Sequence, residues 1–245
     1  MTDVFEMIAR ASRDGAASLD LRSMDLLELP AEIGQLTELK VLVVSYNHLT
    51  SLPAEIRQLI NLRRLDVSSN QLTALPESIG RLTALQELVV WNNQLTELPE
   101  SIGQLTALKV LYVSANQLTA LPESIGELTS LERLVVSCNH LTSLPDAIGQ
   151  LAALQVLSVS CNQLTALPES IGQLAALQRL DVWDNRLKSL PPEIFQLTEL
   201  KELWLHGNQF EAFPHKIVDL PSIRGIYIDK NACLAPWAKG TNDDA

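Results

Sequence analysis

Two cysteines and one histidine carry the most distinctive chemistry in this sequence. Cys138 and Cys161 are 23 residues apart, and His140 follows two positions after the first. If both thiols lie on adjacent parallel strands, their Cα atoms are about 4.8 Å apart, a distance that a disulfide can span. Two thiols and one imidazole do not complete a zinc site. We therefore expect free thiols and no metal, with an oxidisable pair and a metal site as alternatives.

Sequence signatures of catalysis are missing. The chain contains no GxxxxGK[ST], GxGxxG, HExxH, CxxC or GxSxG. Asp181 and Asp184 are close in sequence, but nothing nearby suggests the apolar pocket or partner base that would make one of them a catalytic acid. We predict that the chain is not an enzyme and uses no cofactor.

These residues are positioned by a repeat that fills most of the chain. Prolines recur every 23 residues, at positions 30, 53, 76, 99, 122, 145, 168, 191 and 214. A fixed period of this size is typical of a solenoid. A clean unit, LRRLDVSSNQLTALPESIGRLTA, spans residues 62–84, and leucine makes up 46 of the 245 residues. We predict nine full repeats and a closing strand.

Each part of the unit predicts a local structure. Leu65 and Val67 alternate with polar residues, as in a short strand with one buried face. Pro76 and Glu77 predict a short helical turn on the far side, because proline suits the first helical position and an acid suits the helix N-terminus. An amide can bond N–H and C=O groups where the chain leaves the sheet, which predicts a ladder of stacked asparagines. Its members are Asn47, Asn70, Asn93, Asn116, Asn139, Asn162, Asn185, Asn208 and Asn231.

The unit resembles the 23-residue class of the leucine-rich repeat family, with the pattern LPxxIGxLxxLxxLxVSxNxL. The resemblance implies an α/β fold, a curved leucine-rich repeat solenoid with a parallel β-sheet on the concave face and short helical turns on the convex side. Within the family the repeat is similar to those of Ras-group intracellular scaffolds and bacterial Roco GTPases, which implies a signalling partner such as a small GTPase. Met24 departs from the ladder asparagine, and Arg57, Phe195 and Val218 replace the usual glycine.

The two ends of a solenoid need covers. Residues 1–15 predict an N-terminal helical cap with Asp3 and Glu6 as a capping pair and Gly15 at its end. Residues 16–231 predict the solenoid. Residues 232–245 predict a C-terminal cap and tail, in which Trp237 covers the last repeat.

Variation among the repeats is concentrated at four positions per repeat that we expect on the concave face. Along the solenoid these positions form four rows, which in one repeat are represented by Arg64, Asp66, Ser68 and Ser69 in that order. In the third row serine is the default, and we expect it to be solvated. Two apolar patches on this face are predicted to bind a partner, since exposed apolar patches and tryptophan anchors mark binding sites. The residues of the first patch are Val89, Trp91, Tyr112 and Val135, those of the second are Trp183, Trp204, His206 and Tyr227, and those between are Arg133, Ser158 and Asp181. The alternative is that scattered surface aromatics carry no function.

Charged residues on the same face predict ion pairs. Arg64 stands beside Glu87, and Arg179 stands beside Glu202, on neighbouring strands. Cross-strand pairs of this kind stabilise a sheet modestly.

Composition and charge narrow the function. Lys and Arg total 18 and Asp and Glu total 29, a formal net charge of −11 that disfavours nucleic acid and anionic membranes. The start MTDVFEMIAR lacks signal-peptide features, and three cysteines do not suit a disulfide scaffold. We predict a cytoplasmic, monomeric, non-catalytic protein-interaction module, an adaptor or scaffold. The alternatives are a targeting segment of a larger enzyme such as a Roco GTPase or bacterial effector, and carbohydrate binding on Trp91 and Trp183.

Overall fold

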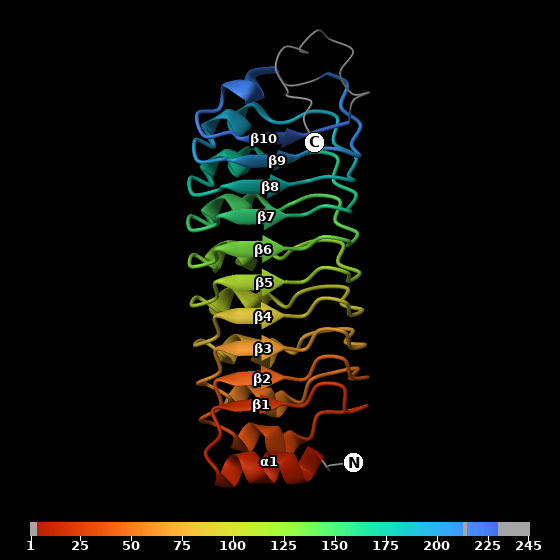
Figure 1. Ribbon diagram of the computed structural model, residues 1–245, viewed down its shortest axis with the longest axis vertical. Helices are drawn as coiled ribbons and strands as arrows, with labels where there is room; N and C mark the ends of the chain where they lie inside the picture. The colour runs from red at the N-terminus through yellow and green to blue at the C-terminus, as the bar shows by residue number, and fades with distance from the viewer. Residues whose placement is uncertain (1–3, 213–214, 230–245) are drawn as a thin grey trace, which may run out of the picture.

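A ten-stranded parallel sheet organises the chain. The computed structural model describes residues 4–212 and 215–229. Within them, helix α1 (Val4–Arg13) precedes strands that pair in sequence order, each with its neighbours along the chain. Figure 1 shows the strands stacked as a ladder above α1. The strands are β1 (Ser18–Asp20), β2 (Val41–Val43), β3 (Arg64–Asp66), β4 (Glu87–Val89), β5 (Val110–Tyr112), β6 (Arg133–Val135), β7 (Val156–Ser158), β8 (Arg179–Asp181), β9 (Glu202–Trp204) and β10 (Gly225–Tyr227).

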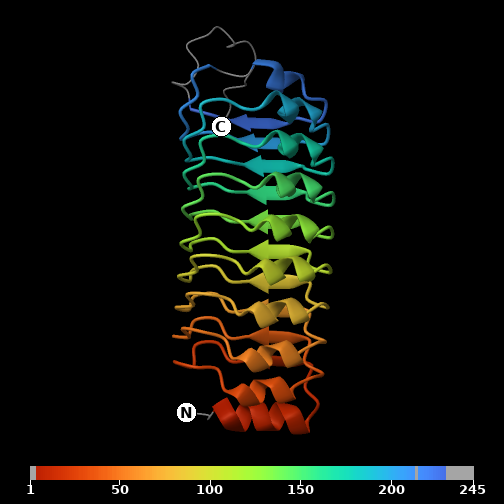
Figure 2. The same ribbon diagram turned by 180° about the vertical axis from the view of Figure 1, so that it is seen from behind.

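Short 3-10 helices form the opposite side of the solenoid. In Figure 2, which views the molecule from behind, they lie in front of the sheet; along the chain, one follows each of the first nine strands. They confirm the predicted helical turns. The helices are η1 (Ala31–Gln35), η2 (Ala54–Gln58), η3 (Glu77–Arg81), η4 (Glu100–Gln104), η5 (Glu123–Glu127), η6 (Asp146–Gln150), η7 (Glu169–Gln173), η8 (Pro192–Gln196) and η9 (His215–Asp219).

The core lies between the sheet and these turns. The pairing register places each strand residue beside the residue 23 positions later, so that Leu65 neighbours Leu88. Both are fully buried, as are the equivalent leucines of the central strands. A short strand with one buried middle residue cannot be stable alone, so the repeats are stabilised by stacking on one another.

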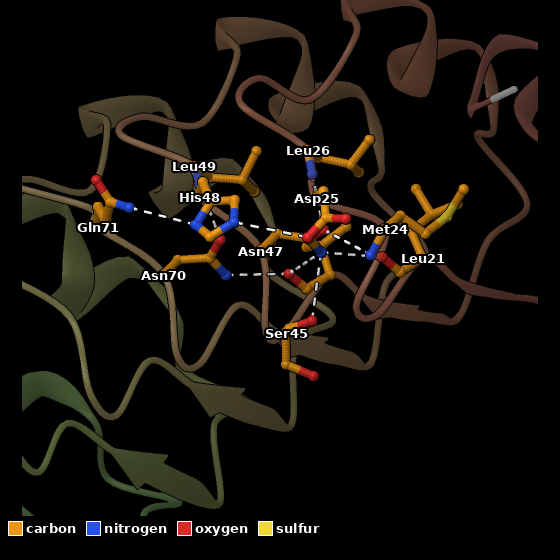
Figure 3. A network of polar contacts seen from close by, with 11 residues as sticks. Leu21, Met24, Asp25, Leu26, Ser45, Asn47, His48, Leu49, Asn70 and Gln71 are labelled. Carbon is orange, nitrogen blue, oxygen red and sulfur yellow. Dashed lines mark hydrogen bonds and ion pairs between the residues drawn. The ribbon is translucent and has the colours of Figure 1, made fainter. Parts of the chain in front are cut away.

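The asparagine ladder is confirmed for eight of its nine predicted members, Asn47 to Asn208. Figure 3 shows the first of them. Asn47 Oδ1 accepts hydrogen bonds from the N–H groups of Met24 and Leu26, both at 3.0 Å, and Nδ2 donates to the carbonyls of Leu21 and Val44, both at 2.9 Å. Each amide therefore satisfies buried backbone groups in its own repeat and in the preceding one. Asn231 lies outside the described residues.

One detail of the helical turns differs from the prediction. Pro76 has φ −68° and ψ 145°, so it is extended and precedes η3, and Glu77 is the first helical residue. The prolines before η1 to η8 share this conformation. The fixed φ of proline suits an extended residue as well as a helical one, so the predicted first helical position was wrong by one residue.

Helix α1 packs against the first repeat. Ile8 and Ala11 are buried, and Val4 and Met7 pack against the same core. Gly15 has φ +58°, a left-handed conformation that suits the end of a helix. The bounds of the cap, residues 1–15, and of the solenoid, residues 16–231, stay predictions. Asp3 and the predicted C-terminal cap with Trp237 lie outside the described residues.

Candidate partner-binding surface

The outer face of the sheet is built from two kinds of position. The strands hold only three residues each, so the first two predicted rows lie on strands and the other two lie beyond the strand ends. Residues of the fourth row have left-handed backbones, which turn the chain away from the sheet and into the asparagine ladder. They are Tyr46, Ser69, Asn92, Ala115, Cys138, Cys161 and Asp184, with φ from 52° to 56°, and Gly207, with φ 69°.

The four residues of the second predicted patch lie together, with their rings in contact. We name Trp183, Trp204, His206 and Tyr227 the C-terminal aromatic cluster. Trp183 stacks on His206 with ring centroids 5.2 Å apart, and Trp204 stacks on Tyr227 at 3.8 Å. Trp204 and His206 meet edge to face at 6.0 Å, which joins the two stacks. Tyr227 is exposed and the other three are half-buried.

Charged groups border this cluster. The Arg179 guanidinium lies 5.0 Å from the centroid of the Trp204 ring and forms ion pairs with Asp181 at 3.5 Å and Glu202 at 3.4 Å. The predicted pair of Arg179 with Glu202 is thus confirmed. The Arg64–Glu87 pair is also present, and Arg64 contacts Asp66 at 3.2 Å.

The sequence predicted that Asp181 is open to a partner, and this prediction was wrong. Its exposed fraction is 5%, because Ser158 Oγ donates to its Oδ2 at 3.2 Å and Arg179 and Trp204 lie beside it. Among the described residues, Asp181 Oδ1 and Trp204 Nε1 are buried and have no hydrogen-bond partner.

The first predicted patch forms only in part. Trp91 is 36% exposed and Val89 only 4%, so the prediction of an exposed Val89 was wrong. In register Val89 lies between Asp66 and the much larger Tyr112, and its short side chain is covered by its surroundings. Tyr112 and Val135 are half-buried.

Sequence reasoning missed Tyr46. Its ring is 55% exposed and meets Trp91 edge to face, with centroids 6.2 Å apart. We name these two residues the N-terminal aromatic pair. The available signal was that Tyr46 is the one aromatic residue in a row of small and polar residues. Contact across two repeats requires a long side chain, which single-repeat patterns do not reveal.

The serines of the third row are less exposed than predicted. Ser45, Ser68 and Ser160 are buried. In the middle of the sheet the hydroxyls form a chain, in which Ser137 Oγ lies 2.8 Å from both Ser158 Oγ and Ser160 Oγ. Because Ser158 also donates to Asp181, this network links the centre of the sheet to the C-terminal aromatic cluster.

Cys138 and Cys161 carry free thiols. Cys161 Sγ donates to Asp184 Oδ2 at 3.4 Å. Burial, followed by hydrogen bonds with Cys138 and Asp184, raises the pKa of Cys161 to about 12. The thiol is therefore protonated and weakly nucleophilic at neutral pH. Among the described residues no three His, Cys, Asp or Glu side chains form a group that could hold a metal ion.

Known repeat proteins match most of the chain. The family model "Leucine-rich repeat region" matches residues 18–95 and 88–166, and "Leucine rich repeat" matches residues 175–232. No curated protein sequence matches the chain closely enough to count as a relative. In the part of the chain that the structure describes, no helix is long and apolar enough to cross a membrane.

Solved structures with the same fold include bacterial and plant proteins. An LRR protein of Leptospira interrogans is 36% identical, with a TM-score of 0.64, over 91% of this chain and 70% of that one. The leucine-rich repeat domain of the type III effector XopL is 30% identical, with a TM-score of 0.82, over 92% of this chain and 80% of that one. The LRR ectodomain of the Arabidopsis thaliana receptor kinase GASSHO1/SCHENGEN3, solved with CASPARIAN STRIP INTEGRITY FACTOR 2, is 32% identical, with a TM-score of 0.80; the match covers 89% of this chain but only 27% of that one. The predicted likeness to Ras-group and Roco repeats stays a prediction.

Proposed function

Because the chain belongs to the leucine-rich repeat family, we propose that it is a non-catalytic module that binds a partner protein on the concave face of its sheet. The observation that carries the proposal is that this face has two aromatic groups, the N-terminal aromatic pair and the C-terminal aromatic cluster. Nine repeats fold around aliphatic side chains, and the core does not require Trp91 or Trp183 to stand where other repeats have serine. Large rings at the centre of an interface supply most of its binding free energy.

The two aromatic groups suit a partner that contacts several repeats at once. Trp91 follows β4 and Trp183 follows β8, so four strand spacings, about 19 Å, separate them along the solenoid. A segment of partner chain lying along the sheet face could contact both. The LRR ectodomain of GASSHO1/SCHENGEN3 was solved in complex with CASPARIAN STRIP INTEGRITY FACTOR 2, and the plant peptide hormone receptor RGFR1 was solved in complex with RGF2, which supports a similar use of this fold here.

The finer parts of the proposal concern the cellular role. We infer a cytoplasmic adaptor or scaffold in signal transduction that acts as a monomer, with a small GTPase or another signalling protein as partner. The free thiols of Cys138 and Cys161 support a reducing compartment. Catalysis is left to the partner, since the motifs of common enzyme classes are absent from the sequence.

A second candidate is a targeting segment of a larger protein. It is favoured by the likeness to the repeat domain of XopL, a type III effector. In this case the same concave face would select the partner or substrate, and the chemistry would reside elsewhere in the protein. A full-length gene that continues into a catalytic domain distinguishes this candidate from a stand-alone adaptor.

Capture of a partner by matched variants tests the proposal. Trp91→Ala and Trp183→Ala should each retain the circular dichroism spectrum of the parent and lose affinity for the captured partner by roughly thirtyfold, the usual effect of truncating an interface tryptophan. Glu123→Ala, in η5 on the opposite side, should bind like the parent. If both tryptophan variants bind at parental affinity, the concave face is not the binding surface. If both unfold, the rings belong to the core.

A further inference from the structure

Three arginines occupy the same place in the repeat, and only two of them are neutralised. Arg64 contacts Asp66, two residues later, and Glu87 in the next strand. Arg179 contacts the equivalent acids, Asp181 and Glu202. Each of these two arginines therefore has its carboxylate partners within the sheet.

Arg133 has the same position without the acids. The residue two positions later is Val135, and the neighbour in the next strand is Val156. Its side chain is exposed, and among the described residues its guanidinium has no ion pair. The adjacent acid, Glu132, pairs instead with Lys109 at 3.1 Å. An unpaired arginine surrounded by valine therefore stands in the centre of the sheet face.

A partner that covers this face must supply the missing charge. Burying a guanidinium under a partner without a counter-charge is strongly unfavourable. The planar fork of arginine matches a carboxylate, to which it donates two parallel hydrogen bonds. The net charge of −11 does not prevent this contact, because charges more than about 8–10 Å away are largely screened at physiological salt.

We propose that Arg133 binds an Asp or Glu side chain of the partner, between the N-terminal aromatic pair and the C-terminal aromatic cluster. The inference rests on the proposed binding of a partner segment along the concave face. β6 lies two strands from β4 and two from β8, so Arg133 is about 10 Å along the solenoid from the level of Trp91 and from that of Trp183. An extended chain covers about 10 Å in three residues. The recognised segment therefore carries an acid about three residues from an apolar residue on each side.

Selection from a random peptide library displayed on phage tests this pattern. The intact chain should enrich peptides with a central Asp or Glu and apolar residues about three positions on either side. Arg133→Glu should enrich Lys or Arg at the central position instead. Arg63→Glu makes the same charge change at an exposed position just before β3, and should keep the preference for an acid.

A synthetic peptide with the enriched sequence gives the quantitative test. Arg133→Ala should weaken its binding by about tenfold or more, the usual effect of losing a hydrogen bond to a charged group. Changing the acid of the peptide to its amide should weaken binding to the parent chain to a similar extent and weaken binding to Arg133→Ala no further. If the selected binders depend on Trp91 and Trp183 but lack a preferred acid, only the inference about Arg133 is overturned. The same holds if they bind Arg133→Glu as tightly as the parent chain. If no selected peptide depends on these tryptophans, the proposed function fails, and the inference fails with it.

Discussion

Single side chains determine how one repeat is joined to the next. Asn116 accepts a hydrogen bond from the N–H of Leu95 at 3.0 Å and donates to the carbonyls of Val90 and Val113 at 3.1 and 3.0 Å. These backbone groups are buried and have no access to water. The amide therefore fills a structural role that an apolar side chain of similar volume cannot fill.

Asn116→Leu tests this role. The substitution leaves buried N–H and C=O groups without partners, so we expect the free energy of unfolding to fall by about 1–3 kcal/mol. Urea unfolding followed by circular dichroism measures the change. Gln117→Ala, at the exposed neighbouring position, is the matched control and should leave the midpoint unchanged. An unchanged midpoint in Asn116→Leu would remove the ladder from the account of stability.

The two thiols should differ in reactivity. Cys138 is exposed, whereas the pKa of Cys161 is raised to about 12, first by burial and then by hydrogen bonds with Cys138 and Asp184. Because only the thiolate reacts, alkylation by iodoacetamide should modify Cys138 first, and the rate at Cys161 should keep rising as the pH is raised towards 12. Mass spectrometry of the alkylated peptides over time measures both rates.

Asp184→Asn is the informative variant for this pair. It removes a negative charge and a carboxylate acceptor beside Cys161, so the pKa of Cys161 should fall and its alkylation should accelerate. Asparagine tolerates the left-handed backbone of this position, where φ is 53°. Equal rates at both cysteines in the parent chain, or a rate at Cys161 that does not respond to the variant, would contradict this account.

The exposed fraction of a single side chain was harder to predict from the sequence than the face of the sheet on which it lies. Alternation along the strand correctly places Val89 and Asp181 on the outer face, but both are covered by neighbours on adjacent strands. Tyr46 was missed because its contact with Trp91 crosses two repeats. Direction follows from the local period of the chain, whereas exposure depends on the size of side chains 23 or more residues away.

At the scale of elements, the 3-10 helices stack closely enough to exclude side chains. A Cβ atom added to Gly126 would lie 2.7 Å from the carbonyl oxygen of Ala147 and 2.9 Å from its Cβ. Equivalent glycines face the next helix in the same way, at Gly80, Gly103, Gly149 and Gly172. In the repeats that have it, this glycine therefore allows the close spacing between successive turns, a reason that the sequence pattern alone did not show.

Gly126→Ala should destabilise the solenoid. The added methyl group overlaps the backbone of the next repeat, and overpacking of this kind costs about 1–3 kcal/mol. Thermal or urea unfolding measures the loss. Ser124→Ala, in the same helix, is the control: its hydroxyl is buried without a hydrogen-bond partner among the described residues, and alanine already stands one repeat later at position 147. We expect this control to match or slightly exceed the stability of the parent. Similar losses in both variants would show that the close contact at Gly126 is not responsible.

At the scale of the whole molecule, repetition made the fold predictable. Nine copies of one pattern indicate the strand, the ladder asparagine and the helical turn together, so an ambiguity in one copy is resolved by the others. The binding surface has no such redundancy, because its residues are those that differ from repeat to repeat. Arg133 is an example, because its lack of acidic partners is recognised only by comparison with Arg64 and Arg179, which have them.

Removing one repeat changes the spacing between the two aromatic groups without ending the solenoid. Deletion of residues 154–176 joins Ala153 to Leu177 in the phase of the repeat, and each repeat contacts only its neighbours, so the shortened chain should fold. The deletion shortens the distance between Trp91 and Trp183 along the solenoid by about 4.8 Å, which is more than the length of one residue in an extended chain. A peptide selected on the parent should then lose contact with one aromatic group, and its affinity should fall roughly thirtyfold.

Deletion of residues 62–84 is the matched control for this experiment. It shortens the solenoid equally and brings Tyr46 one repeat nearer to Trp91, but it leaves the spacing of Trp91 and Trp183 unchanged, so the selected peptide should keep contact with both tryptophans. A new selection on the chain lacking residues 154–176 should yield peptides whose apolar residues are one to two positions closer together, because an extended chain advances about 3.4 Å per residue. Circular dichroism and urea unfolding confirm that both shortened chains fold before binding is compared. Equal affinities for the two deletion variants would show that the two aromatic groups do not act together on one partner segment.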